Sequence, residues 1–263
     1  MSKLYHGDSR NMKELTDNSV HLVITSPPYF DLKRYNEAQN HIDNIGDPKT
    51  YDEYLENLNS VWKECIRVLG PDGKLCINIM PVFLSGKETT FKRRVTRTVI
   101  SDIENYMNST QEMYLQSLYI WDKRKIVRFS SFGSYPYPTN MFSSFPYEWI
   151  IVFSKRGKRL PVEKTIKENS KLTHQEWRGW ATNSIWEMQP AKAKSVGHPA
   201  PFPDELPRRL IKLYSFHGDT VLDPFVGSGT TVRVAQELGR IGIGYDVNPD
   251  YIELAKKYTK PKF

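Results

Sequence analysis

Short apolar runs alternate with longer amphipathic segments along most of this chain. Residues 21–25 and 241–245 are short and mostly apolar, which is typical of strands buried on both faces of a sheet. Residues 51–69 instead place apolar side chains three and four positions apart, which predicts an amphipathic helix. The expected strands are residues 21–25, 74–79, 118–121, 149–153, 220–222 and 241–245, and the expected helices are residues 51–69, 205–216, 230–238 and 250–258.

Strands that alternate with helices predict an α/β fold with a doubly wound, mostly parallel sheet. Gly70 is expected to end the first helix, and Pro71-Asp72-Gly73 to form a turn before the next strand. The length of 263 residues allows one substantial core, with a small appended lobe.

Two segments break the alternation of strands and helices. Residues 85–116 are polar and basic, and residues 155–195 mix basic with aromatic side chains. Basic residues beside aromatic ones suit phosphate contacts together with base stacking, although a solvated loop is the common alternative. The basic and aromatic residues are Lys87, Lys92, Arg93, Arg94 and Arg97 in the first segment, and Lys155, Arg156, Lys158, Arg159, Lys164, Lys167, Lys171, Trp177, Arg178 and Trp180 in the second.

The first candidate site is Thr25-Ser26-Pro27-Pro28-Tyr29, directly after an apolar run. Proline fixes φ and lacks a backbone donor, so the strand must end in a stiff, exposed turn. Such a turn leaves a carbonyl and the Ser26 hydroxyl as acceptors for an exocyclic amino group, with Tyr29 able to stack on the ring that carries it. An ordinary proline-rich loop is the alternative.

The second candidate site is the segment at residues 220–231, which predicts a strand, a glycine turn and the start of a helix. Gly227 and Gly229 allow a close backbone approach to a ligand. Asp246 follows at the tip of the next predicted strand, where a carboxylate suits hydrogen bonds to ribose hydroxyls. Because the turn lacks both a phosphate-loop lysine and a third glycine, a nucleoside without pyrophosphate is the better ligand. A purely structural turn is the alternative.

The charge and the cysteine content of the chain limit which partners and reactions are expected. The chain has 37 Lys and Arg against 30 Asp and Glu, a net charge of +7 that suits a polyanionic partner. The spacing of Cys and His matches no zinc site, so no metal is expected and a zinc deaminase is disfavoured. Cys65 and Cys76 read as small buried apolar residues. With neither a signal pattern nor a membrane-length apolar stretch, a cytoplasmic protein without membrane contact is expected.

The two sites and their order resemble the β group of S-adenosylmethionine-dependent DNA amino methyltransferases. In that family a (D/N/S)-P-P-(Y/F) motif comes first, a recognition region follows, and an F-x-G-x-G cofactor motif closes the chain. Ser26-Pro27-Pro28-Tyr29 matches the first motif and Phe225-Val226-Gly227-Ser228-Gly229 the last. The segment at residues 198–203 is similar to the family element at the methionine end of the cofactor, and residues 5–8 are similar to its element near the adenine.

The resemblance implies a Rossmann-like methyltransferase fold in permuted order with a small target-recognition insert. Residues 1–154 would be the catalytic half, 155–195 the recognition region, and 196–263 the cofactor-binding half of the same domain. The implied catalytic residues are Ser26, Pro27, Pro28 and Tyr29. The implied S-adenosyl-L-methionine site comprises Asp8, His198, Pro201, Phe202, Asp223, Pro224, Phe225, Gly227, Ser228, Gly229, Thr230, Thr231 and Asp246. The expected DNA contacts are Arg93, Arg94, Lys155, Arg156 and Arg178, with Arg93 and Arg94 on an arm over the duplex.

The resemblance also implies the reaction. Serine at the first motif position is typical of cytosine N4 methylation in duplex DNA after base flipping, whereas aspartate or asparagine is typical of adenine N6. The adenine reaction is the alternative, and a non-catalytic DNA-binding module or an RNA or small-molecule methyltransferase are further ones. Neither cysteine follows a proline, which disfavours carbon-5 methylation. The expected setting is a prokaryotic cytoplasm, near the nucleoid, with a cognate restriction endonuclease as partner and the enzyme a monomer or homodimer.

All of these expectations depend on one geometric condition. The proline corner after Thr25 and the glycine corner after Asp223 must lie side by side at the carboxyl edge of one sheet.

Overall fold

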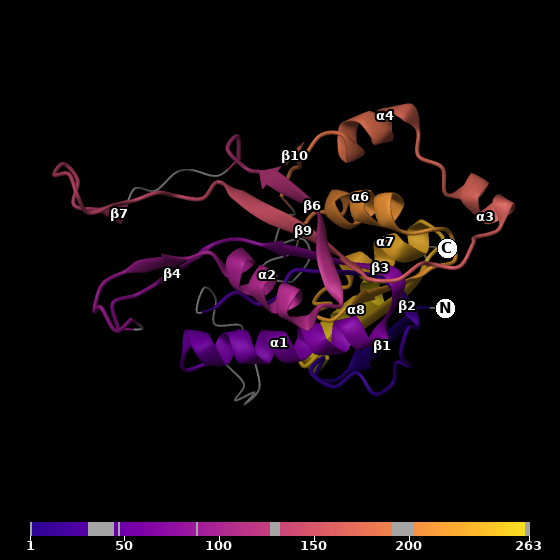
Figure 1. The fold of residues 1–263 in the computed structure, drawn as a ribbon, viewed down its shortest axis with the longest axis horizontal. Coiled ribbons are helices and arrows are strands. Elements are labelled where there is room, and N and C mark those ends of the chain that lie inside the picture. Colours follow the sequence, from indigo (N-terminus) through magenta and orange to yellow (C-terminus); the bar gives the residue numbers. More distant parts are fainter. Residues whose placement is uncertain are drawn as a thin grey trace.

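The computed structural model describes residues 2–30, 45–46, 48–87, 89–126, 132–190 and 202–260. Within them, one eight-stranded sheet crosses the molecule (Figure 1). Its strands are β1 (Lys3–His6), β2 (Val20–Thr25), β3 (Leu69–Ile79), β6 (Met113–Asp122), β9 (Tyr147–Lys155), β10 (Ile185–Glu187), β11 (Thr220–Asp223) and β12 (Ile241–Asp246).

The strand order is β1-β12-β11-β2-β3-β9-β6-β10. The five strands from β1 to β3 are all parallel, and β10 is parallel to β6. Only β9 runs against its neighbours, β3 and β6. The predicted doubly wound, mostly parallel sheet is therefore confirmed.

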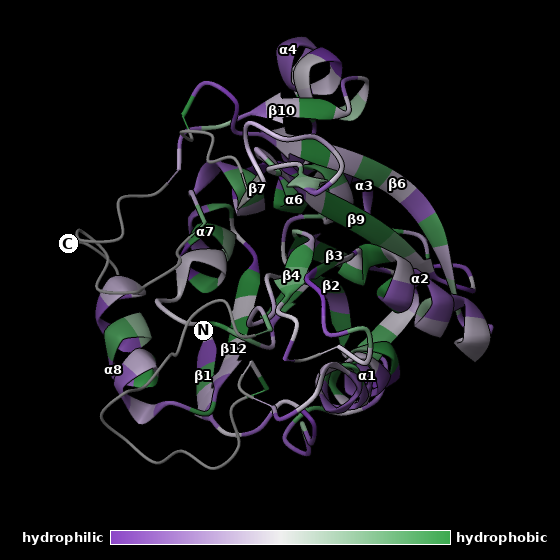
Figure 2. Ribbon diagram, turned by 90° about the vertical axis from the view of Figure 1, so that its left-hand side faces the viewer, coloured by the Kyte–Doolittle hydropathy of each residue, from purple (hydrophilic) through white to green (hydrophobic). Residues whose placement is uncertain are grey.

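Helices cover both faces of the sheet, as Figure 2 shows. The helices α1 (Tyr51–Val68) and α2 (Val99–Thr110) lie on one face, and α6 (Glu205–Tyr214) and α7 (Thr230–Glu237) on the other. Successive residues of β2 serve the two cores alternately: Val23 packs with α1, while Leu22 and Ile24 pack with α6 and α7. A strand buried on both faces reads as a continuous apolar run, which is why β2 was visible in the sequence. A further helix, α8 (Pro249–Tyr258), packs against β1 and β12.

The first helix ends directly before Gly70, as predicted, but without a glycine in the left-handed conformation. α1 begins after the N-cap Thr50, whose side chain accepts from Glu53 N, but its C-cap is Leu69 in an extended conformation. The chain then enters β3 directly, and the predicted turn is an irregularity within that strand, since Val20 pairs with Leu69 but Leu22 pairs with Lys74. Sheet pairing on both sides of residues 70–73 explains why the turn signal did not break the strand.

The predicted basic insert at residues 85–116 is more regular than its composition indicated. It contains α2, whose Val99, Ile103 and Met107 are buried, and the second strand of a hairpin formed by β4 (Val82–Leu84) and β5 (Val95–Arg97). Another small hairpin, β7 (Phe132–Gly133) with β8 (Met141–Phe142), lies between β6 and β9. Both hairpins extend beyond the sheet on its carboxyl side, at the left of Figure 1.

Residues 156–184 lead from the end of β9 to β10. They contain α3 (Lys164–Asn169), α4 (His174–Glu176) and a π-helical turn, η1 (Trp177–Ala181). Ion pairs join this segment to the core: Arg159 binds Asp219, and Glu176 binds Lys212 of α6. None of the described helices combines the length and apolar character that crossing a bilayer requires.

Candidate active site

The proline corner and the glycine corner are neighbours. β2 and β11 pair in parallel, with Val221 opposite Leu22 and Leu222 opposite Val23. Both strands therefore end at the same edge, and the Thr25 hydroxyl donates to Asp223 Oδ1 at 2.8 Å. The geometric condition set by the sequence is confirmed: two corners about two hundred residues apart are joined by a direct side-chain hydrogen bond.

Asp223 holds the glycine corner together from within. Its carboxylate accepts from the hydroxyls of Thr25 and Thr231 and from Phe225 N at 3.1 Å. The side chain is only 1% exposed, and burial raises its pKa to about 6. Asp223 was predicted to bind the cofactor; the structure shows that it shapes the loop which would do so.

The glycine corner has the backbone conformation that the sequence predicted. Gly227 and Gly229 have φ of 48° and 86°, and α7 starts directly after them at Thr230. A β-carbon on Gly229 would lie 3.0 Å from the β-carbon of Ala255 in α8. The loop therefore needs glycine twice over, for its left-handed φ and for the close approach of α8.

Asp246 lies at the tip of β12, as expected. Its Oδ2 accepts from Gly227 N at 3.0 Å and its Oδ1 from Asn248 N at 2.9 Å. Burial raises the pKa of this carboxyl to about 6. Each oxygen keeps a lone pair, so the carboxylate can accept from ligand hydroxyls while it holds the loop.

Asp8 reaches the same edge through a strand that the pattern did not predict. β1 pairs with β12, His6 opposite Asp246, and Gly7 N donates to the Asp246 carbonyl. The Asp8 carboxylate is bound by Arg10, whose guanidinium also donates to Asn57. Asp8 and Asp246 thus flank the ends of adjacent strands, although Asp8 is already in an ion pair.

The proline corner carries an ordered set of polar groups. Ser26 Oγ lies 3.4 Å from the Tyr29 hydroxyl, which donates to Glu148 Oε2 at 3.2 Å. The Pro28 carbonyl accepts from the Tyr54 hydroxyl at 2.9 Å, so it is already engaged. The Tyr29 ring is 7% exposed, which leaves little of it for the predicted stacking on a base in this conformation.

Sequence reasoning missed a buried polar cluster behind this corner. Glu148 forms an ion pair with Lys123 and accepts from Asn78 Nδ2 at 2.5 Å. Asn78 Oδ1 is buried and has no hydrogen-bond partner among the described residues. The available signal was an acidic residue, Glu148, at the beginning of the apolar run of β9.

The expected DNA contacts divide into two groups. Arg93 and Arg94 are exposed on the hairpin of β4 and β5, on the side of the proline corner. Lys155 lies at the opposite edge, where its ammonium donates to the carbonyls of Ile66 and Leu69 at 2.7 Å. A side chain that caps α1 there is not placed to meet DNA at the carboxyl edge.

Arg156 and Arg178 both belong to the segment that joins β9 to β10. Arg156 follows Lys155 and donates its backbone N–H to Glu112. Arg178 is exposed on η1, which packs on α6. Lys155 therefore lies at the opposite edge from the proline corner, whereas β10, which pairs in parallel with the last residues of β6, ends at the carboxyl edge.

The element expected at the methionine end of the cofactor is described only in part. His198 and Pro201 lie outside the described residues. Phe202 is partly buried and packs with the core under α6.

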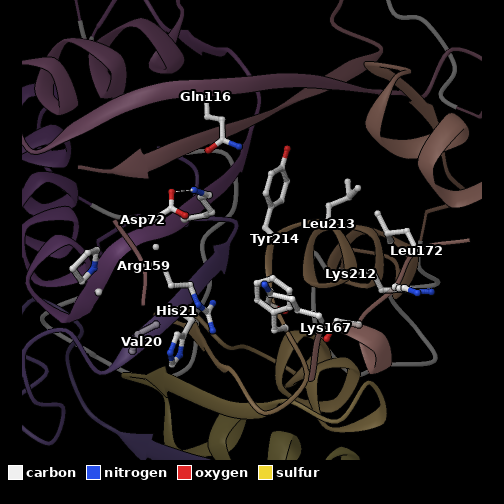
Figure 3. A pocket seen from close by; sticks show the side chains of 18 of the residues that line it. Val20, His21, Asp72, Gln116, Arg159, Lys167, Leu172, Lys212, Leu213 and Tyr214 are labelled. Carbon is white, nitrogen blue, oxygen red and sulfur yellow. Dashed lines mark hydrogen bonds and ion pairs between the residues drawn. The ribbon is translucent and has the colours of Figure 1, made fainter. Parts of the chain in front are cut away.

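A cavity of about 700 Å³ lies at the amino edge of the sheet (Figure 3). Its walls include Val20 and His21, at the beginning of β2, and Gly70, near the beginning of β3, so it lies at the opposite edge of the sheet from Ser26. Two of its cations are neutralised, Arg159 by Asp219 and Lys212 by Glu176. The described residues contain no His, Cys, Asp and Glu group able to hold a metal ion.

Comparison with known proteins agrees with this geometry. The sequence profile of a DNA methylase family matches residues 20–257. The Type II methyltransferase M.MjaI of Methanocaldococcus jannaschii is 35% identical over 270 residues, covering 94% of this chain and 87% of the relative. The Type II methyltransferase M.HpaI of Haemophilus parainfluenzae is 30% identical over 255 residues, covering 96% of this chain and 72% of the relative.

Solved structures show the same fold. A Thermus thermophilus protein assigned as a DNA modification methylase, in complex with S-adenosyl-L-methionine, superposes with a TM-score of 0.76 at 30% identity, over 98% of this chain and 93% of that one. The cytosine-N4-specific PvuII DNA methyltransferase shares the fold with a TM-score of 0.61 at 21% identity, over 98% and 86% of the two chains. From the profile match and these relatives, this chain belongs to the N6/N4 family of DNA methylases.

Proposed function

We propose that this chain transfers a methyl group from S-adenosyl-L-methionine to the exocyclic N4 of cytosine in duplex DNA. The observation that carries the proposal is the junction of the two corners through Thr25 and Asp223, at 2.8 Å. This junction holds the acceptors for the target amino group next to the loop proposed to bind the cofactor. Methyl transfer from the cofactor to that amino group requires the two to be neighbours. Methylation of adenine N6 at the same corner is the second candidate, because both bases present an exocyclic amino group.

The residues of the glycine corner fit the methyl donor. Asp246 can accept from ribose hydroxyls, and the φ values of Gly227 and Gly229 open the loop to close approach. When bound, S-adenosyl-L-methionine supplies an electrophilic methyl group on a cationic sulfur. Phe225, which packs edge-on against Trp62 with ring centroids 6.5 Å apart, offers an aromatic face suited to that cation.

The proline corner would activate the target nitrogen. The lone pair of an exocyclic amino group is delocalised into the ring, so acceptors for its two hydrogens return electron density to nitrogen. The Ser26 hydroxyl and the Pro27 carbonyl are the proposed acceptors. Pro27 is the better choice of the two prolines because Tyr54 already occupies the Pro28 carbonyl. Most of the acceleration would come from positioning.

The preference for cytosine rests on Ser26, since serine at this motif position is typical of N4 methylation in the family. A base inside a duplex must flip out before it reaches the corner, at a cost of a few kcal/mol. A flipped base needs protein elements that hold the rest of the duplex.

The two hairpins at the carboxyl edge are suited to hold the duplex. Arg93 and Arg94 are exposed on one of them, beside the exposed Phe91. The other exposes Tyr135 and Tyr137. Cationic and aromatic side chains together suit phosphate contacts and base stacking. We place the DNA contacts here and not at residues 155–184.

The named relatives are Type II methyltransferases, so we propose that this chain protects DNA in a restriction–modification system, with a cognate endonuclease as partner. Its oligomeric state, monomer or homodimer, stays a prediction.

The test uses the purified full chain, methyl-labelled S-adenosyl-L-methionine and duplex DNA, followed by digestion to nucleosides. We expect the label in N4-methylcytosine. Label found only in N6-methyladenine would show that the target base is adenine, and the proposed reaction, methylation of an exocyclic amino group, would stand. No transfer to DNA, with the cofactor bound, would refute the proposal.

A further inference from the structure

Behind the proline corner, Glu148 is surrounded by hydrogen-bond donors. It is 7% exposed, on β9, and its Oε1 meets the ammonium of Lys123. Its Oε2 accepts from Asn78 Nδ2 and from the Tyr29 hydroxyl. The four side chains come from different strands or loops, so only the assembled sheet brings them together.

The donors around Glu148 indicate whether its carboxyl group is ionised. An ionised carboxylate only accepts, whereas a protonated one must also donate. Glu148 faces an ammonium, an amide NH₂ and a phenol. The positive charge of Lys123 favours the ionised carboxylate, which then accepts from the amide and from the phenol. The contacts shown therefore belong to the ionised carboxylate.

The ionised Glu148 in turn determines how Tyr29 and Ser26 share their protons. A phenol has one proton, and Tyr29 gives it to Glu148 at 3.2 Å. In its 3.4 Å contact with Ser26, Tyr29 can then only accept, so the Ser26 hydroxyl is the donor. Contacts of this kind are often long in a free enzyme and shorten when substrate binds. With its proton directed to Tyr29, Ser26 presents only lone pairs to the rest of the site.

We propose that Glu148 is a positioning residue, which acts through Tyr29 to make Ser26 a hydrogen-bond acceptor for the target amino group. The inference rests on the proposed function, since an acceptor is needed only if the substrate is an amino group. Glu148 itself does not touch the base. Lys123 and Asn78 keep its carboxylate in place, and together the cluster sets the direction of the hydrogen bonds at the corner.

Replacing Glu148 with glutamine should reverse this direction. Glu148→Gln keeps the size of the side chain, and Lys123 would attract the amide oxygen. The amide NH₂ would then face both Asn78 and Tyr29. Asn78 can accept from it by turning its Oδ1 toward it, and Tyr29 accepts as well, so the Tyr29 proton would turn to Ser26 and occupy one of its lone pairs. We expect kcat for methyl transfer to fall roughly 10- to 100-fold, the effect of losing a strong hydrogen bond, with an unchanged Kd for S-adenosyl-L-methionine.

Aspartate distinguishes this role from simple packing. Glu148→Asp is shorter but still only accepts, so it should lose less activity than the isosteric Glu148→Gln. A packing role predicts the opposite order. Glu187→Gln is the matched control, because Glu187 pairs with Lys125 at the same edge but is exposed. It should leave kcat within about twofold of the unaltered protein, as expected of a surface ion pair.

A double-mutant cycle with Tyr29→Phe completes the test. Phenylalanine removes the hydroxyl that links Glu148 to Ser26, so Glu148→Gln should reduce kcat by less than about threefold more in that background. Independent, multiplicative effects of the two substitutions would overturn the inference, as would a fully active Glu148→Gln beside an active unaltered protein. If the unaltered protein transfers no label to DNA, the proposed function itself is refuted, and the inference with it.

Discussion

The two edges of the sheet carry similar side chains but use them differently. At the amino edge, Lys155 caps α1 and Arg159 is paired with Asp219, so these two cations join parts of the protein to one another. At the carboxyl edge, Arg93 is exposed on a hairpin beside the proline and glycine corners. Basic residues that look alike in a sequence can therefore have different roles: some join parts of the fold, and others are exposed to a partner.

The same contrast holds for concave surfaces. The amino edge has a cavity of about 700 Å³ (Figure 3), and two of the cations that line it, Arg159 and Lys212, are in ion pairs. The carboxyl edge holds the polar groups to which the proposed function gives a role, including Ser26, Asp246 and Glu148. Ligands of doubly wound sheets bind at the carboxyl ends of the strands, so the positions of the strand ends favour the carboxyl edge for the proposed site.

The largest effect should come from removing the acceptor at the carboxyl edge. Ser26→Ala deletes the hydroxyl proposed to bind the target amino group, and we expect kcat to fall roughly 100-fold or more. The Kd for S-adenosyl-L-methionine should stay unchanged, because the glycine corner is untouched. Labelled-methyl transfer and equilibrium binding measure the two quantities.

Ser170→Ala is the control at the amino edge, since Ser170 lines the cavity there. It should leave methyl transfer within about twofold of the unaltered protein, the usual effect of a substitution distant from a site. A large loss of kcat in Ser170→Ala would contradict the assignment of chemistry to one edge.

Two glycines with nearly equal φ allow the edges to be compared directly. Gly229 (φ 86°) lies at the carboxyl edge against Ala255, while Gly218 (φ 85°) lies before β11 with nothing within 4 Å of an added β-carbon. Gly218→Ala should lower the free energy of unfolding by about 1 kcal/mol, from the left-handed φ alone. Gly229→Ala adds a steric clash and should lower it by about 2–4 kcal/mol.

The same pair separates stability from binding. Gly229→Ala should also displace the loop and weaken S-adenosyl-L-methionine binding by about tenfold. A loss of roughly 1.4 kcal/mol in binding free energy corresponds to that factor. Gly218→Ala should not. Urea unfolding measures the change in stability, and calorimetry measures the change in cofactor affinity. Equal effects of both variants on cofactor binding would show that the glycine corner does not bind the cofactor.

Sequence pattern predicted the strands that carry both corners because each is a short apolar run buried on two faces. It did not predict Glu148, because the contact with Tyr29 spans 119 positions and depends on β9 lying between β3 and β6. That order is set by pairing, which hydrophobic periodicity does not record. Nor did it predict α2, although the spacing of Val99, Ile103 and Met107 was available inside a segment judged by its charge.

A smaller effect, on DNA affinity, tests whether Arg93 and Arg94 contact DNA while Lys155 does not. The double variant Arg93→Ala/Arg94→Ala should weaken the binding of duplex DNA by about 3- to 10-fold at moderate salt. It should also reduce the slope of log affinity against log salt by up to about 1.8, or about 0.9 for each phosphate that is no longer neutralised. Lys155→Ala should lower the free energy of unfolding but leave that slope unchanged. Titrations of labelled duplex at several salt concentrations decide between them, and a changed slope in Lys155→Ala alone would place the DNA at the opposite edge.

The smallest effect concerns pH and the two buried carboxyls of the carboxyl edge. Burial raises the pKa of both Asp223 and Asp246 to about 6 in the folded protein. Because each binds its proton more tightly folded than unfolded, both contribute to a fall in the free energy of unfolding as pH rises from about 4 to about 6, and that contribution then levels off. Only Asp246 is proposed to accept from the ribose.

Cofactor binding should depend on pH in the opposite sense. Ionised Asp246 accepts ribose hydroxyls better than its protonated form, so the affinity for S-adenosyl-L-methionine should weaken by a few-fold between about pH 7 and about pH 5. Asp246→Asn cannot titrate in this range, so it should bind more weakly at neutral pH and lose most of that dependence. Asp223→Asn separates the second carboxyl, since it should retain the pH dependence of binding while changing that of stability. If the pH dependence of binding instead persisted in Asp246→Asn and disappeared in Asp223→Asn, the carboxyl group that contacts the ligand would be that of Asp223.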